Sequence, residues 1–150
     1  MKLKNKVIFL IILFFIIIIS SIYLYLTNIN NKRTIEINNL RIEVWVARTP
    51  AEKAQGLSGK KELKENEGMI FVYDDYQIRT FWMKDMLFSI DTLWLLDNEV
   101  VGIEKNIPLT EDGGVKKYHS PIPVNYVLEV SSGFANRNSI NVGDIVKFNL

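Results

Sequence analysis

The chain contains no cysteine and only one histidine among its 150 residues. The absence of cysteine excludes a disulfide scaffold, a thiolate zinc site, an iron–sulfur cluster and a cysteine nucleophile. A single histidine excludes a metal site built from several histidines of one chain. We therefore expect no bound metal and no cofactor, and the sequence does not point to a particular reaction.

Acidic residues are missing from the first part of the chain. Residues 1–33 hold five basic residues and no acidic one, which leaves 13 basic and 17 acidic residues in 34–150. The formal charge of residues 34–150 is therefore −4, although that of the whole chain is +1. Binding to nucleic acid requires a basic surface, so we expect no nucleic-acid partner.

Residues 7–26 form a continuous run of 20 residues without a charge. Such a run can cross a hydrocarbon core of ~30 Å as a helix. It predicts a transmembrane helix over 7–26, with a basic cytoplasmic flank at 1–6 and a polar linker at 27–33. The run is longer, and its end bulkier, than in a cleavable signal peptide, so we favour an uncleaved anchor. Cleavage after Ser20-Ser21, which would release a secreted domain, is the alternative.

The basic residues around this segment predict its orientation. Lys2, Lys4 and Lys6 precede it, whereas Lys32 and Arg33 follow it. The positive-inside rule then favours a cytoplasmic N-terminus. We expect a single-pass protein of the cytoplasmic membrane that contacts the membrane through residues 7–26 and carries an extracytoplasmic C-terminal domain.

Residues 34–150 consist mainly of short apolar runs separated by turn residues, which predicts a mainly β domain, a compact sandwich or barrel of about 7–9 short strands. One short helix is expected near 50–57, because Thr49 can cap it, Pro50 suits its first position and Glu52 completes a capping box. Residues 132–139 can hold one further helical turn. Residues 105–125 have no clear pattern and predict a long loop, either functional or a plain surface loop. The expected strands are 34–37, 40–46, 68–73, 78–83, 90–96, 99–103, 125–131 and 144–148.

Three motifs occur in order along this domain: GMIF at 68–71, FWMK at 81–84 and YVLEV at 126–130. With them, the chain resembles the bacterial and archaeal family of domain of unknown function 192 over about residues 40–149. The resemblance implies a small β-rich fold, often behind an N-terminal signal or anchor, and no established reaction, cofactor or substrate. Ser58-Gly59 and Ser89-Ile90 depart from the usual family pattern. The family-like structural positions are Gly56, Leu57, Gly68, Met69, Phe71, Met83, Gly133, Gly143 and Asp144.

Charged residues lie inside two of these motifs and beside them. Lys84 follows Met83, Asp91 follows Ile90, and Glu129 lies between Leu128 and Val130, so each charge occurs in a largely apolar stretch. A buried carboxylate needs a partner, and Lys84 is the obvious one. With Trp82, which can offer an aromatic surface, these residues are the candidate ligand-binding set. The alternative is a structural ion pair or a set of outward-facing strand residues.

Two other groups of residues suggest chemistry at first sight. His119-Ser120 suggests acyl transfer, but adjacent residues of an extended segment point to opposite sides, and no nucleophile elbow surrounds them. Asp74-Asp75 suggests calcium, but the EF-hand pattern is absent, and we interpret these residues as a turn.

Three hypotheses about function follow. The favoured one is a membrane-anchored extracytoplasmic accessory module that binds a small molecule or an envelope protein. The second is a cell-envelope hydrolase or lyase that uses Asp91 and Glu129 as a carboxylate pair, which requires a separation of ~5–9.5 Å. The third is a purely structural domain. Binding is favoured over catalysis.

Overall fold

The computed structural model describes residues 3–30, 32–109 and 116–150, with the side chains of residues 5–23 in the first of these ranges. The chain forms two compact units, residues 1–32 and 33–150.

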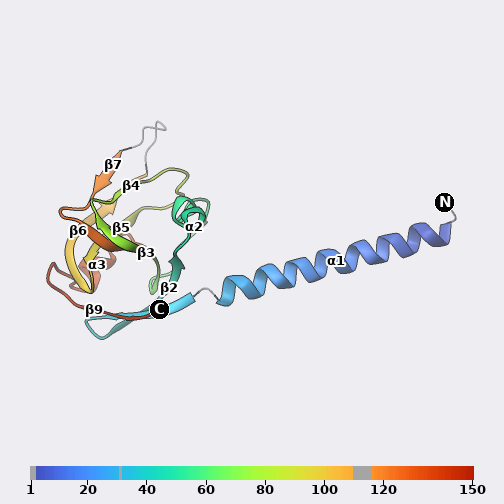
Figure 1. Cartoon of the computed structure of the whole chain (residues 1–150), viewed down its shortest axis with the longest axis horizontal. Coiled ribbons are helices and arrows are strands. Elements are labelled where there is room, and N and C mark those ends of the chain that lie inside the picture. Colours follow the sequence, from blue (N-terminus) through green and yellow to red (C-terminus); the bar gives the residue numbers. More distant parts are fainter. Residues whose placement is uncertain (1–2, 31, 110–115) are drawn as a thin grey trace. The chain divides into compact units, whose positions relative to one another are not determined.

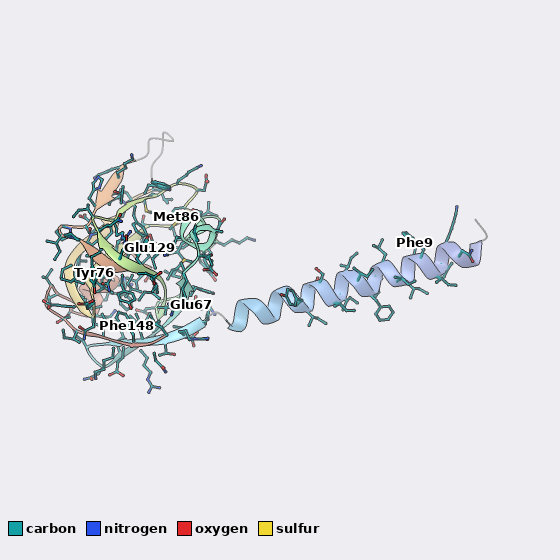
Figure 2. All side chains as sticks on the ribbon, in the orientation of Figure 1. Phe9, Glu67, Tyr76, Met86, Glu129 and Phe148 are labelled. Carbon is teal, nitrogen blue, oxygen red and sulfur yellow. The ribbon has the colours of Figure 1, made fainter. Side chains whose placement is uncertain are left out.

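The first unit is the helix α1, Leu3–Asn30. Its segment Asn5–Tyr23 has a mean hydropathy of 2.7 and is long and apolar enough to cross a membrane. Its apolar side chains, such as Phe9, project away from the helix into the surroundings (Figure 2). The Ser21 hydroxyl donates a hydrogen bond to the carbonyl of Ile17 at 2.9 Å, which satisfies this polar group inside the apolar segment. The predicted spanning helix is thus present by length and composition.

Helix α1 extends beyond the predicted boundaries on both sides. It reaches Asn30, and the first strand begins at Lys32. The segment 27–33, expected as a polar linker, is therefore occupied largely by the end of a helix and the start of a strand. The asparagines of this segment led us to expect irregular structure, but they follow a long helix that can continue through them.

The second unit is mainly β, as predicted, and contains a seven-stranded sheet with the order β6-β5-β8-β3-β2-β1-β9 and a two-stranded ribbon β4-β7 (Figure 1). Strands β2 and β3 run parallel, whereas β3-β8, β5-β8, β5-β6 and β1-β9 are antiparallel. The strands are β1 Lys32–Ile37, β2 Leu40–Ala47, β3 Glu67–Gln77, β4 Thr80–Trp82, β5 Ile90–Leu96, β6 Glu99–Ile107, β7 Lys117–His119, β8 Val124–Ser131 and β9 Val146–Asn149.

The seven-stranded sheet curls until its outer strands meet at one end. Glu99 of β6 forms a bridge with Ile145, just before β9. The Val100 amide donates to the Asp144 carbonyl at 2.9 Å, and the Val146 amide donates to the Asn98 carbonyl at 2.8 Å. These bonds satisfy backbone groups that an open sheet edge would expose, and they give the domain its barrel-like shape.

Alternation along the strands gives the sheet an inner and an outer face, each with its own hydrophobic cluster. Every strand of the large sheet contributes to the inner cluster, whereas the outer cluster lies on the central strands and is covered by loops and by β4-β7. The inner cluster includes Ile35, Ile42, Ile70, Leu93, Leu128, Val130, Phe134 and Val146. The outer cluster includes Ala47, Leu57, Met69, Phe71, Met83, Trp94, Tyr118 and Val127.

The predicted short helix is α2, Pro50–Gln55, and its capping box is confirmed. The Glu52 amide donates to Thr49 Oγ1 at 3.2 Å, and the Thr49 amide donates to Glu52 Oε2 at 2.8 Å. Gly56 ends the helix at a φ of +51°, and a Cβ there would lie 3.4 Å from the Phe71 ring. Helix α2 provides the crossover that the parallel strands β2 and β3 require.

Other local predictions are confirmed or corrected by the structure. Asn38 and Asn39 both adopt positive φ in a tight turn, and 132–139 contains the short helix α3, Phe134–Arg137. The predicted long loop at 105–125 contains strand β7, whose pairing with β4 could not be predicted because each strand has only three residues. Residues 110–115 of that stretch lie outside the described residues.

Candidate functional site

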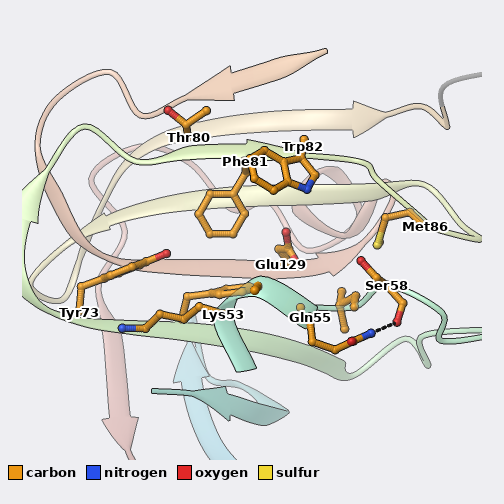
Figure 3. A pocket seen from close by; sticks show the side chains of 13 residues that line it. Lys53, Gln55, Ser58, Tyr73, Thr80, Phe81, Trp82, Met86 and Glu129 are labelled. Atoms are coloured by element: carbon orange, nitrogen blue, oxygen red, sulfur yellow. Dashed lines mark hydrogen bonds between the residues drawn. The ribbon is translucent and has the colours of Figure 1, made fainter. Parts of the chain in front are cut away.

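A cavity of about 240 Å³ lies on the outer face of the sheet, between α2 with its following turn and strands β3, β4 and β8 (Figure 3). Helix α2 forms one side of it, and the β4 segment with Phe81 and Trp82 forms the opposite side. The residues that line the cavity and bear on its chemistry are Lys53, Leu57, Ser58, Phe71, Tyr73, Phe81, Trp82, Met86 and Glu129.

Glu129 supplies the carboxyl group of this cavity. Its side chain is only 5% exposed, and Figures 2 and 3 place it inside the domain, between α2 and β4. Within the described part of the chain its carboxyl group has no hydrogen-bond or salt-bridge partner, and burial raises its pKa to about 8. Thr92, which faces Glu129 across the β5-β8 pair, also has a buried hydroxyl without a described partner. Buried polar groups normally form hydrogen bonds, so the Glu129 carboxyl and the Thr92 hydroxyl lack the partners that such groups usually have.

Aromatic rings form much of the cavity wall. Phe81 meets Phe71 edge to face, with ring centroids 4.8 Å apart, and it packs in the same way against Trp94 at 5.7 Å. These contacts fix the orientation of the Phe81 ring. Trp82 is held less tightly, because its side chain is 48% exposed.

Tyr73 lies at one end of the cavity between two cations. Lys53 Nζ lies 4.1 Å and Arg79 Cζ lies 3.7 Å from the centroid of its ring. Arg79 is further engaged by an ion pair with Asp75. Burial raises the pKa of the Tyr73 hydroxyl, with Arg79 opposing this shift and Glu129 adding to it. Tyr73 is therefore a neutral hydroxyl at physiological pH, held beside the buried acid.

Asp91 is fully buried on the opposite face of the sheet. Its Oδ1 accepts hydrogen bonds from the amides of Asn106 and Gly133 at 2.8 and 3.0 Å, and its Oδ2 accepts one from the amide of Ala135 at 2.9 Å. The carboxylate thus joins β5 to β6 and to the start of α3. Its hydrogen bonds explain how this charge is accommodated without Lys84.

The two carboxylates predicted to form a pair lie on opposite faces of the sheet. Asp91 faces Val130 across the β5-β8 pair, whereas Glu129 faces Thr92, and successive residues of a strand alternate between faces. Asp91 packs with the inner cluster, and Glu129 opens to the cavity on the outer face. The two groups cannot act on one bond, so the hydrolase or lyase based on this pair has no structural support.

Lys84 is exposed and forms no described salt bridge with either carboxylate, in contrast to the pairing expected from the sequence. Its backbone carbonyl accepts a hydrogen bond from the Ser58 hydroxyl at 2.9 Å, which joins the β4 segment to the turn after α2. Of the four predicted site residues, the structure brings Trp82 and Glu129 together in the cavity and leaves Lys84 and Asp91 outside it.

Several family-like positions support this region through close packing or backbone geometry. Leu57 and Phe71 line the cavity with Gly56, and Met69 and Met83 belong to the outer cluster. A Cβ at Gly68 would lie 2.8 Å from the Glu129 carbonyl, so only glycine lets β3 approach β8 this closely. Gly133 and Gly143 adopt positive φ. The Asp144 carboxylate accepts a hydrogen bond from the Asn141 amide at 2.9 Å, which stabilises the turn that contains both residues.

The two sites rejected from the sequence also have structural explanations. His119 Nδ1 lies 3.0 Å from the Thr80 hydroxyl across the β4-β7 ribbon, and the Arg79 amide donates to the Ser120 hydroxyl at 3.0 Å. Asp74 and Asp75 lie within strand β3, so the turn predicted at these residues is wrong, and Asp75 forms an ion pair with Arg79. Among the described residues, no group of three or more potential metal ligands occurs.

Sequence reasoning missed Lys53, Tyr73, Phe81 and Met86 as parts of the cavity. Phe81 lies in the FWMK motif, which was a usable signal. The other three come from α2, the middle of β3 and the segment after β4, and they meet only through the tertiary fold.

The fold and the site define a small barrel-like β domain with an aromatic cavity and a buried acid on the outer face of its sheet. Its sequence matches the model of the family DUF192, described as "Uncharacterized ACR", over residues 33–148. The chain belongs to this family, as the three motifs indicated. No protein of curated function gives a significant match.

The solved structures that resemble this chain include the following two crystal structures. A protein of unknown function from Novosphingobium aromaticivorans DSM 12444 is 29% identical, with a TM-score of 0.73 over 78% of this chain and 85% of that chain. A protein described as "a putative transcription regulator" from Sinorhizobium meliloti 1021 is 24% identical, with a TM-score of 0.72 over 77% of this chain and 92% of that chain. The second likeness concerns the fold alone.

Proposed function

We propose that this domain binds a small molecule in the cavity that contains Glu129, and that α1 anchors it at the outer surface of the cytoplasmic membrane. The observation that carries the proposal is the buried Glu129 carboxyl group, which faces a cavity without a described partner. A buried acid without a partner lowers stability, and an apolar residue of similar size would avoid that cost. A bound ligand gives this acid a partner.

The lining of the cavity also supports binding. Ligand pockets combine an apolar and aromatic wall with a few polar groups that orient the ligand. Here Phe71, Phe81 and Trp82 supply the wall, while Glu129 and Tyr73 supply the polar groups. Pockets for drug-sized molecules span about 300–1,000 Å³. The volume of about 240 Å³ therefore suits a ligand smaller than most drugs.

We expect at least one class of small molecule to raise the melting temperature of the intact protein in a maltoside detergent. The panel comprises amines, sugars, short peptides and nucleotides. A ligand at 100 times its Kd stabilises by about 2.7 kcal/mol, which corresponds to a shift of roughly 10 °C for a domain of this size. Trp82→Ala removes part of the cavity wall and should reduce the shift.

Leu87→Ala is the matched control for Trp82→Ala, because Leu87 is similarly exposed and does not line the cavity. A shift that survives both Trp82→Ala and Glu129→Gln would place the ligand elsewhere. If no compound in the panel changes the melting temperature, the proposed small-molecule function is wrong, and a protein partner or a structural role is favoured instead.

The anchored topology can be tested with single cysteines, since the chain contains none. Lys61 is exposed, so Lys61→Cys should react with a membrane-impermeant maleimide added to intact cells. Lys4→Cys should react only after the membrane is permeabilised. We expect the labelled protein to retain its full mass of 17.4 kDa. Labelling of Lys4→Cys from outside would reverse the orientation, and a shortened chain would indicate a cleaved signal.

A further inference from the structure

We propose that the ligand of this cavity is a small organic monocation, whose ammonium group pairs with the Glu129 carboxylate and packs against the aromatic wall. This inference rests on the proposed function, because it names the ligand class of the same cavity.

The buried acid of the cavity forms no ion pair among the described residues. Lys53 lines the same cavity, but its ammonium group lies 4.1 Å from the centroid of the Tyr73 ring and forms no described ion pair with Glu129. Glu129 is buried, and no described basic group lies close enough to form a salt bridge with it. Lys84 is exposed outside the cavity, and Arg79 is engaged by Asp75 and by the ring of Tyr73. The cavity therefore holds a potential anion with space beside it, which an ammonium group fits in both charge and position.

An aromatic wall lies opposite Glu129. Phe81 and Trp82 lie on the β4 side of the cavity, Glu129 lies between them and α2, and Tyr73 closes one end (Figure 3). The electron-rich faces of such rings attract cations, most strongly where water is excluded. A carboxylate combined with aromatic rings binds an ammonium group through both its charge and its methyl or methylene surface.

The cations of the protein itself use this chemistry around the cavity. Lys53 and Arg79 pack against Tyr73, and Lys60 Nζ lies 3.5 Å from the centroid of the Trp45 ring on the same face of the sheet. Lys53 also lines the cavity. The positive charge of Lys53 would repel a second ammonium group on a ligand. The site therefore favours a ligand with one positive charge over a polyamine.

The competing class is a neutral ligand that accepts a hydrogen bond from protonated Glu129. It would use the acid but gain nothing from the cation-binding property of the rings. The two classes differ in one measurable respect. Binding of a cation to ionised Glu129 displaces its proton, whereas binding of a neutral acceptor retains it.

The test compares choline with its neutral carbon isostere 3,3-dimethylbutan-1-ol by calorimetry. The intact chain is used in a maltoside detergent, whose headgroup carries no ammonium. We expect choline to bind at least about tenfold more tightly than the alcohol. Glu129→Gln should weaken choline by a similar factor and leave the alcohol unchanged. Glu99→Gln is the matched control, because Glu99 is an exposed glutamate outside the cavity and its substitution should leave choline binding unchanged.

Proton release provides a second measurement. The charged and titratable groups that face Glu129 are Lys53 from α2 and Tyr73 from β3, while β4 and β5 contribute the uncharged Phe81, Trp82 and Thr92. Choline itself does not titrate near neutral pH. Its binding at pH 7 should release close to one proton from the wild-type protein and none from Glu129→Gln, as measured in two buffers of different ionisation enthalpy.

The outcomes separate this inference from the proposed function. If both compounds bind equally, or if the alcohol binds more tightly, the cavity binds ligands but the cation is the wrong class. The cation is also the wrong class if neither choline nor n-butylammonium binds while another compound of the panel does, and Trp82→Ala weakens that compound. If nothing in the panel binds, the proposed function fails and this inference fails with it.

Discussion

The wild-type domain is expected to lose stability as the pH rises from 4.5 to 8, and replacing Glu129 with glutamine should abolish most of this loss. Burial raises the pKa of Glu129 from its ordinary value of 4.5 to about 8. Between these values the folded protein keeps the proton that the unfolded chain has lost. The contribution of protonated Glu129 to the free energy of unfolding is therefore fully present below pH 4.5. It falls as the pH rises and is lost by about pH 8.

Among the effects of pH on the free energy of unfolding of this domain, we expect this one to be the largest. A shift from 4.5 to about 8 corresponds to about 5 kcal/mol in the free energy of unfolding. Whole domains are typically stable by only about 5–15 kcal/mol. Glutamine keeps the shape of the side chain without titrating, so its stability should not depend on pH through this group.

Denaturant unfolding of both proteins from pH 4 to 9, followed by tryptophan fluorescence in detergent, measures the difference. Glu99→Gln is the matched control, because Glu99 is an exposed strand glutamate and its substitution should leave the wild-type profile intact. A wild-type profile that is flat between pH 4.5 and 8 would mean that Glu129 has a partner in solution, and the buried acid would then give no reason to expect a ligand.

Substitution of Asp91 is expected to destabilise the domain by at least about 3 kcal/mol, because each buried amide left without a partner costs about 1–3 kcal/mol. Three backbone amides, those of Asn106, Gly133 and Ala135, depend on this carboxylate. Alanine would leave all of them unpaired. Asparagine does not rescue the site, because its NH₂ group must face at least one amide donor in either orientation.

The unfolding free energies of Asp91→Ala and Asp91→Asn test this structural role. Asp74→Asn serves as the control, since Asp74 is an exposed aspartate on β3 and should change stability by less than about 0.5 kcal/mol. Because Asp91 lies on the inner face, the fraction of either variant that remains folded should bind cavity ligands normally. Full stability in Asp91→Asn would contradict the assigned role.

Local features of the fold could be predicted from the sequence because their causes are local. The capping box of α2 uses residues three apart, and the turn at Asn38-Asn39 depends on the tolerance of asparagine for positive φ. The apolar runs at 68–73 and 125–131 predicted the core strands β3 and β8. Strand β7 of the ribbon β4-β7 was not predicted, because a strand of three residues is too short to show an alternation of apolar and polar residues.

The candidate site was harder to predict, because its geometry depends on register. The sequence marked Asp91 and Glu129 alike, as charges among apolar neighbours. A difference of one position in the β5-β8 pairing decides whether two side chains share a face, and here they do not. Lys84 could not be excluded as their partner until the course of the chain after β4 was known.

The position of β1 between β2 and β9 has a consequence for how the domain is made. Strand β1 leaves the ribosome first and must wait for its neighbour β9, which is synthesised last. During that interval the inner cluster lacks Val146, and one edge of β1 remains unpaired. Strand pairing between distant parts of a chain is slow, and open edges invite aggregation. The edge of β1 that pairs with β9 therefore stays open until residues 146–149 have emerged, and deletion of these four residues should leave that edge unpaired.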